Sequence, residues 1–269
     1  MRRMLMLAVL VSLTAVSASA QFVAPGGSVP VVANLPGQNN TDWRTDVSVV
    51  NLALSDTSVV LVLQPEIRNG APLFETIETE PMTIAAGEQL TMKNIVETVF
   101  GLTDTKGALS IFATDGAPLV ISARIYTLDD EGGSYGQNVE GLLVANKAWT
   151  PGIAHDDFYR TNFGIYLPFD PLPGEPVRFV VRVFDNHGEQ VGSGNLTFNH
   201  VGVQQFSVGA LGVVRVLDGY SEFVCLGAGG AVFASASRVE QRTGGAGSRG
   251  ARGSRGGGPS SEIAPAGVP

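Results

Sequence analysis

Apolar residues recur at every second position in several short stretches of the chain. The stretches 44–50 and 163–167 place one face of an extended chain toward a core and the other toward water. Other stretches are rich in β-branched and apolar residues, as buried or half-buried strands are. These further predicted strands are 59–63, 119–125, 177–183 and 213–217.

Glycine-containing turn signals separate these stretches, and helical patterns are scarce. The predicted turns are Asn69-Gly70, Asp115-Gly116, Gly188, Asp218-Gly219 and Gly229-Gly230. The single helical candidate runs from Asn94 to Phe100 and ends before Gly101. Short strands with regular turn signals predict an all-β protein with antiparallel sandwich architecture.

The same order of motifs occurs twice along the chain. Pro36-Gly37 is followed by Trp43-Arg44-Thr45-Asp46, and Pro151-Gly152 is followed by Tyr159-Arg160-Thr161-Asn162, with Arg44 and Arg160 separated by 116 positions. Asn69-Gly70 matches His187-Gly188 at an offset of 118, and Ser122-Ala123-Arg124 matches Ala236-Ser237-Arg238 at an offset of 114. Self-similarity at one period predicts two tandem sandwich domains, at 21–145 and 146–242.

The two ends of the chain differ from these domains. Residues 1–20 carry Arg2 and Arg3, an apolar run and Ala18-Ser19-Ala20, which predict a signal peptide cleaved after Ala20. The apolar run is shorter than the roughly 20 residues that span a bilayer. Residues 243–269 are dominated by Gly, Ser, Ala, Arg and Pro, and such a tail is predicted to be disordered. We therefore expect a secreted protein, periplasmic or extracellular, that does not span a membrane after cleavage.

The composition limits the partners and the covalent bonds that we expect. The chain has 17 Lys and Arg against 25 Asp and Glu, so its formal net charge is −8, which argues against a nucleic-acid partner. The one cysteine, Cys225, excludes an internal disulfide. By the offset of 114 it aligns with Ile111 on an inward face, which favours a buried thiol over a catalytic one.

The recurring motif has two interpretations. Its aromatic residue and arginine, Trp43 and Arg44 or Tyr159 and Arg160, could stack on a sugar or peptide and hold an anion. Alternatively, Thr45, Asp46, Thr161 and Asn162 satisfy backbone groups at the start of a strand while the arginines cover a sheet edge. A motif that both copies share favours the structural role, and the same holds for Arg124 and Arg238.

Catalytic and metal-binding patterns are sparse. His155, Asp156, Asp157 and His187 are the residues of an alternative hypothesis, a secreted hydrolase or metal-dependent enzyme, with His200 as a further candidate ligand. Asp129, Asp130 and Glu131 precede two glycines and are a candidate calcium site, but solvated charges at a hairpin tip give the same pattern. No cofactor is expected.

Several short motifs together resemble a family of uncharacterised secreted bacterial proteins with tandem Ig-like β-sandwich repeats. They are Val29-Pro30, Trp43 to Val47, Asn51, Phe100-Gly101 and Tyr135-Gly136-Gln137. The resemblance implies fold and export but no activity, because this fold hosts many unrelated functions. We expect a non-enzymatic binding or structural module of the envelope or extracellular space, with a surface glycan or envelope protein as its partner.

Overall fold

The computed structural model describes residues 23–37, 41–128, 134–141, 146–226, 233–240 and 246–247. The expected signal peptide and the calcium candidate Asp129, Asp130 and Glu131 lie outside these residues, as does Gly229-Gly230. Of the tail expected to be disordered, Ala246–Gly247 form the short strand β19, which pairs with β18. Backbone hydrogen bonds make this pairing without any need for large side chains.

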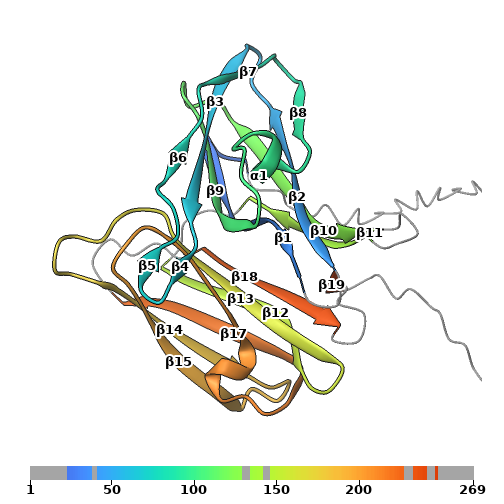
Figure 1. Cartoon of the computed structure of the whole chain (residues 1–269), viewed down its shortest axis with the longest axis vertical. Helices are drawn as coiled ribbons and strands as arrows, with labels where there is room; N and C mark the ends of the chain where they lie inside the picture. Colours follow the sequence, from blue (N-terminus) through green and yellow to red (C-terminus); the bar gives the residue numbers. More distant parts are fainter. Residues whose placement is uncertain are drawn as a thin grey trace, which may run out of the picture.

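The described residues confirm an all-β protein of antiparallel sheets, built as two units that lie one above the other in Figure 1. The first unit comprises β1 (Gly26–Pro36), β2 (Asp42–Asn51), β3 (Thr57–Pro65), β4 (Ile67–Arg68), β5 (Ala71–Pro72), β6 (Ile77–Glu78), β7 (Met82–Ile84), β8 (Gln89–Met92), α1 (Ile95–Thr98), β9 (Thr105–Ala113), β10 (Leu119–Leu128) and β11 (Ser134–Glu140). The second comprises β12 (Lys147–His155), β13 (Tyr159–Leu167), β14 (Val177–Phe184), β15 (Gln190–Phe198), β16 (Gly202–Ser207), the 3₁₀ turn η1 (Val208–Leu211), β17 (Val216–Leu226), β18 (Phe233–Glu240) and β19 (Ala246–Gly247).

The two units share the order of their central strands, although β1 also pairs with β2 and joins the two layers of the first unit into one sheet. In the first, β2 lies between β8 and β10, and β9 lies between β1 and β3. In the second, β13 lies between β16 and β18, and β17 lies between β12 and β14. The short helix α1 precedes β9 just as η1 precedes β17. Each unit is thus a sandwich of two antiparallel layers.

Each sandwich encloses its own hydrophobic core, made by the inward positions of alternating strands. In β3 and β14 buried residues alternate with more exposed ones over most of the strand. The register of the paired strands is also equivalent, since Leu61 opposes Ile111 in one unit and Phe179 opposes Cys225 in the other. The expected alignment of Cys225 with Ile111 therefore holds, and the thiol packs against the second core.

Pro36 and Pro151, which the sequence comparison of the two copies matched, are not at equivalent positions in the fold. Gly37 follows β1 and its N–H donates to the Thr41 carbonyl at 2.7 Å, in the loop between β1 and β2. Gly152 instead lies inside β12, at a shift of register between Pro151 and Ile153. The corresponding shift in β1 lies between Val29 and Val32, on either side of Pro30. Proline lacks the N–H that a ladder needs and is therefore tolerated at such bulges, so Pro151 corresponds to Pro30 rather than to Pro36.

The expected turn at Asp218-Gly219 is also part of a strand. Both residues lie within β17, which begins at Val216, so the predicted strand 213–217 starts too early. Asp218 has a φ of 53°, and a Cβ on Gly219 would lie 2.3 Å from the Phe184 carbonyl oxygen. A left-handed residue beside a glycine is typical of a β-bulge as well as of a turn, which is why the local sequence misled the prediction.

The first unit contributes a side chain to the core of the second. Ile67, at the start of the β4–β5 hairpin, is 7% exposed and belongs to the second core. Its neighbour Glu66 makes a parallel bridge to Val203, just past the start of β16. At Gly202, whose φ is +139°, a Cβ would lie 2.4 Å from the Pro65 carbonyl oxygen. The two units therefore fit closely at this point, and we call the region where they meet the junction.

Candidate functional site

The threonine of the repeated motif has the same role in both units. Thr45 Oγ1 accepts a hydrogen bond from the Ala33 N–H at 2.9 Å and donates to the Ala33 carbonyl at 3.3 Å. Thr161 Oγ1 binds the N–H and carbonyl of Ala154 in the same way, at 3.0 and 2.8 Å. Each threonine thus satisfies both backbone groups of an alanine in the preceding strand, on the side of that strand that faces the motif.

Asp46, the last residue of the first motif, holds the turn that leads into α1. Its buried carboxylate accepts hydrogen bonds from Lys93 Nζ at 2.8 Å, the Asn94 N–H at 2.9 Å and the Tyr126 hydroxyl at 3.2 Å. Burial raises the pKa of Asp46, but the bonds from Lys93, Asn94 and Tyr126 together outweigh burial and keep the pKa below its usual value. This residue stabilises the fold of the first unit.

The two arginines of the last strands are not equivalent. Arg124 lies opposite Asp46. The residue opposite Asn162, the counterpart of Asp46, is Ser237, whereas Arg238 lies one position further along β18. Neighbouring residues of a strand point to opposite faces, so the one-residue difference between the copies places the two arginines in different surroundings.

Each of these arginines nevertheless covers an aromatic ring. The guanidinium carbon of Arg124 lies 5.0 Å from the ring centre of Tyr126, and that of Arg238 lies 4.0 Å from the ring centre of Tyr159. Arg44 instead pairs with Asp42, with 2.8 Å between Nη2 and Oδ2. The Tyr159 ring is thus engaged by an arginine of its own unit.

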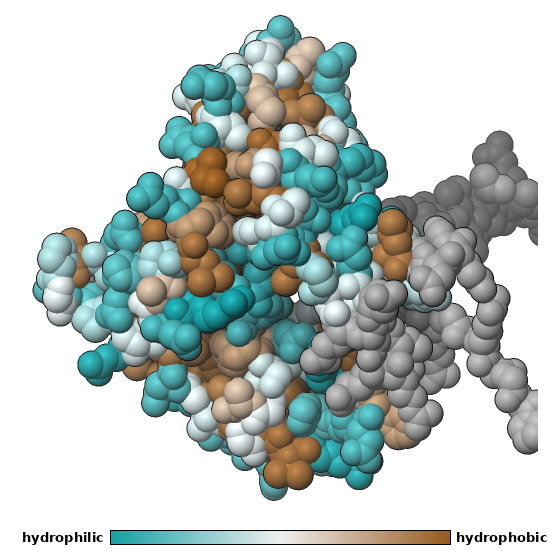
Figure 2. Space-filling view, in the orientation of Figure 1, coloured by the Kyte–Doolittle hydropathy of each residue, from teal (hydrophilic) through white to brown (hydrophobic). Residues whose placement is uncertain are grey.

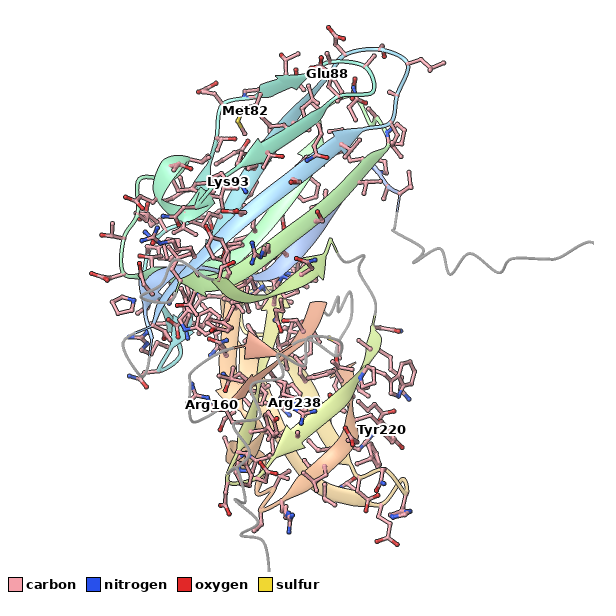
Figure 3. The ribbon with its side chains drawn as sticks, turned by 90° about the vertical axis from the view of Figure 1, so that its right-hand side faces the viewer. Met82, Glu88, Lys93, Arg160, Tyr220 and Arg238 are labelled. Carbon is pink, nitrogen blue, oxygen red and sulfur yellow. The ribbon has the colours of Figure 1, made fainter. Side chains whose placement is uncertain are left out.

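The remaining motif residues, Trp43, Arg160 and Asn162, meet in one cavity between the two units. This junction cavity has a volume of about 300 Å³, and both units line it. Its polar and aromatic lining residues in the first unit are Trp43, Lys106 and Gln137. Those in the second unit are Arg160, Asn162, Gln205, Ser235 and Ser237. Figure 3 shows Arg160 and Arg238 in the second unit and Lys93 in the first.

Strand alternation explains why these residues face the junction. In β13, Thr161 and Phe163 are buried inside the second sandwich. Arg160, Asn162 and Gly164 lie on the other face of the strand and line the cavity. Gly164 keeps the approach close, because a Cβ there would lie 2.3 Å from Val31 Cγ2. The outer face of the second unit thus becomes an inner surface of the two-unit assembly.

A buried hydrogen-bond chain fixes the geometry beside the cavity. Tyr166, on β13, is fully buried, and its hydroxyl donates to Gln64 Oε1. Because a phenol has one proton, Ser110 Oγ is the donor to Tyr166, at 2.7 Å, and Ser28 Oγ lies 2.9 Å from Ser110 Oγ. Burial raises the pKa of Tyr166 well above its usual value, so the hydroxyl stays protonated.

Trp43, on β2, forms part of the cavity wall beside the end of β1. A Cβ on Gly37 would lie 2.4 Å from Trp43 Nε1, so the loop after β1 rests on the indole. This contact explains a glycine at position 37 and fixes one edge of the ring. No motif pointed directly to the cavity. Small and amide side chains at outward strand positions, such as Asn162, Ser235 and Ser237, are nevertheless unlike the long charged residues of a solvated face.

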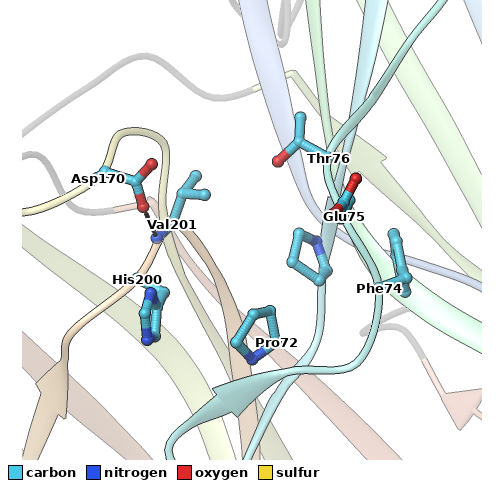
Figure 4. Close-up of a pocket in the computed structure, with 8 residues that line it drawn as sticks. Pro72, Phe74, Glu75, Thr76, Asp170, His200 and Val201 are labelled. Atoms are coloured by element: carbon cyan, nitrogen blue, oxygen red, sulfur yellow. Dashed lines mark hydrogen bonds between the residues drawn. The ribbon is translucent and has the colours of Figure 1, made fainter.

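A second, more open cleft of about 370 Å³ also lies where the two units meet. Figure 4 shows Pro72, Phe74, Glu75 and Thr76 on one side and Asp170, His200 and Val201 on the other. Asp170 Oδ1 accepts a hydrogen bond from the Val201 N–H at 2.9 Å, so that carboxylate holds the loop. Figure 2 shows hydrophilic and hydrophobic residues interspersed over the face of the molecule that is turned to the viewer in Figure 1.

The residues of the enzymatic alternative do not form a metal site in the part of the chain that the structure describes, and several of them shape turns. Asp156 Oδ1 accepts hydrogen bonds from the Phe158 and Tyr159 N–H groups, which shapes the turn between β12 and β13. The His187 N–H donates to Asp185 Oδ1 in the β14–β15 turn, and His155 ends β12. Across the described ranges, no three His, Cys, Asp or Glu side chains group as a metal ion requires. Burial raises the pKa of the Cys225 thiol, which opposes thiolate formation.

Comparisons with protein-family models, with curated proteins and with solved structures each found no match. In the part of the chain that the structure describes, no helix has the length and apolar character needed to cross a membrane.

Proposed function

We propose that the protein is an exported, non-enzymatic binding module of two tandem Ig-like repeats that holds a small polar ligand in the junction cavity. The observation that carries the proposal is that one cavity of about 300 Å³ gathers Trp43, Arg160 and Asn162 from the repeated motif of both units. Small-ligand sites begin at about this volume and favour the boundary between domains.

The repeat and the export signal support different parts of this proposal. The matching strand order and the matching bonds of Thr45 and Thr161 support a duplicated sandwich. The sequence of residues 1–20 supports export, and N-terminal sequencing of the protein released by a bacterium that expresses the full chain tests it. We expect Gln21 as the first residue, and a start at Met1 in the released protein would contradict cleavage.

A screen of small polar compounds for an increase in melting temperature tests the binding role. Ser237→Phe places a ring in the cavity, whereas Ser193→Phe places the same ring at an exposed position of β15. We expect compounds that stabilise the wild type and Ser193→Phe but not Ser237→Phe. Stabilisation that survives Ser237→Phe would place binding elsewhere, and a screen without any stabilising compound would favour a purely structural module.

A further inference from the structure

The ionisable side chains that line the junction cavity are both cations. Lys106 comes from β9 and Arg160 from β13, and the described residues of the lining include no Asp or Glu. The chain as a whole is acidic, with a formal net charge of −8. Cationic lining inside an acidic protein favours a ligand that carries negative charge.

The two cations differ in the shape of their charged groups. Lys106 Nζ lies 3.1 Å from Glu66 Oε1 and donates to Gln205 Oε1 at 2.8 Å, so the ammonium is fixed and partly neutralised at the junction. Arg160 presents a planar guanidinium, whose fork of donors matches the two oxygens of a carboxylate. This fork, which the ammonium of a lysine lacks, makes Arg160 the side chain suited to the charged group of a ligand.

The polar part of the remaining lining suits hydroxyl groups, and the apolar part, which includes Val31, Leu35 and Ile125, suits the C–H face of a ring. Asn162 and Gln137 offer amides, which donate and accept, and Ser235 and Ser237 offer hydroxyls with the same capacity. Trp43 adds an aromatic surface on the same cavity. Amides and hydroxyls beside an aromatic and apolar wall fit a ring that carries several hydroxyl groups and has an apolar face.

We infer that the ligand of the junction cavity is a sugar acid, a polyhydroxylated ring with one carboxylate that pairs with Arg160. This inference rests on the proposed function and names the class of its ligand. A free sugar acid and the acidic end of a glycan chain present the same chemistry, so both forms belong in the test.

The two tryptophans of the chain provide the readout. Trp43 lines the cavity, whereas Trp149 on β12 is 57% exposed and lies outside its lining. Trp149→Phe therefore leaves Trp43 as the single reporter, with its fluorescence sensitive to a ligand in the cavity. The probes are matched pairs that differ in the acidic group: glucuronate with glucose, galacturonate with galactose, and N-acetylmuramate with N-acetylglucosamine. Oligogalacturonate represents a chain end.

In the Trp149→Phe background we expect at least one acid to bind about tenfold more tightly than its neutral partner, because a charge-assisted pair contributes about 1.4 kcal/mol or more. Arg160→Gln should remove this preference. Arg178→Gln makes the same change of charge at an exposed position of β14 and should retain it. Raised salt should weaken the acid and leave the neutral sugar unchanged.

Other outcomes separate the two proposals. Equal binding of acids and neutral sugars, or a preference that survives Arg160→Gln, would overturn the sugar-acid inference and leave the binding role standing. Tighter binding of a tripeptide with a free C-terminal carboxylate would likewise overturn it. An unchanged Trp43 signal with every probe overturns it too, and only a compound screen that also fails removes the proposed function.

Discussion

Removing the Tyr166 hydroxyl tests the buried hydrogen-bond chain at the junction. In Tyr166→Phe the Gln64 oxygen loses its donor and Ser110 keeps only Ser28 as a partner, while the ring keeps its packing. Gln64 is 6% and Ser110 1% exposed, so water replaces the lost partners poorly. A buried group left without its partner costs about 1–3 kcal/mol, and we expect the free energy of unfolding to fall by that amount.

Urea denaturation followed by fluorescence and circular dichroism measures this loss. Tyr220→Phe is the control, because Tyr220 is half-exposed and stacks on Phe184 with ring centres 4.9 Å apart. It should change stability by less than about 0.5 kcal/mol. The double variant Tyr166→Phe with Gln64→Leu should cost less than the two single changes added together, because it removes both partners. Wild-type stability in Tyr166→Phe, or strictly additive costs, would refute the reasoning.

Three further predictions concern each unit and their contact. Ile67→Ala should lower the free energy of unfolding by about 2–5 kcal/mol, because the side chain belongs to the second core. Hydrogen exchange should then report faster opening of the second unit than of the first, and the reverse order would contradict the placement of Ile67. Thr45→Val and Thr161→Val should each cost about 1–3 kcal/mol in urea, and a marked difference between them would contradict their equivalent roles. Because the folded pKa of Asp46 lies below the ordinary value of 3.8, its contribution to stability is complete above that pH and is lost as the pH falls through the folded pKa. Asp46→Asn should therefore give a shallower loss of stability on acidification in urea melts, and a slope identical to that of the wild type would exclude this role.

Local patterns predicted the strands well because inward positions repeat with period two. The stretch 59–63 lies inside β3 and 177–183 inside β14, and the expected helix near Asn94 forms α1. The same reasoning paired Pro36 with Pro151 because a glycine follows each of them. The loop between β1 and β2 is longer than the loop between β12 and β13, so equal spacing to the motif did not mean equal positions in the fold. Hydrogen bonds to the motif threonines reveal the true correspondence, and the sequence does not display those.

The candidate site was only partly accessible to sequence reasoning. The motif itself was found, and its threonines satisfy backbone groups as the structural interpretation expected. What could not be foreseen is that Trp43 of one unit and Arg160 of the other line one cavity. That meeting depends on how two separately folded faces dock, and no periodicity within either copy encodes the contact.

The β4–β5 hairpin has a consequence for how the chain is made and divided. Ile67 is synthesised long before the strands that surround it in the second core, so the earlier half of the chain can supply a ready surface on which the later half closes. A recombinant fragment that begins at β12 would lack this side chain and expose apolar surface in its place. Studies that shorten the protein should therefore retain both halves, or graft residues 65–72 onto the later one.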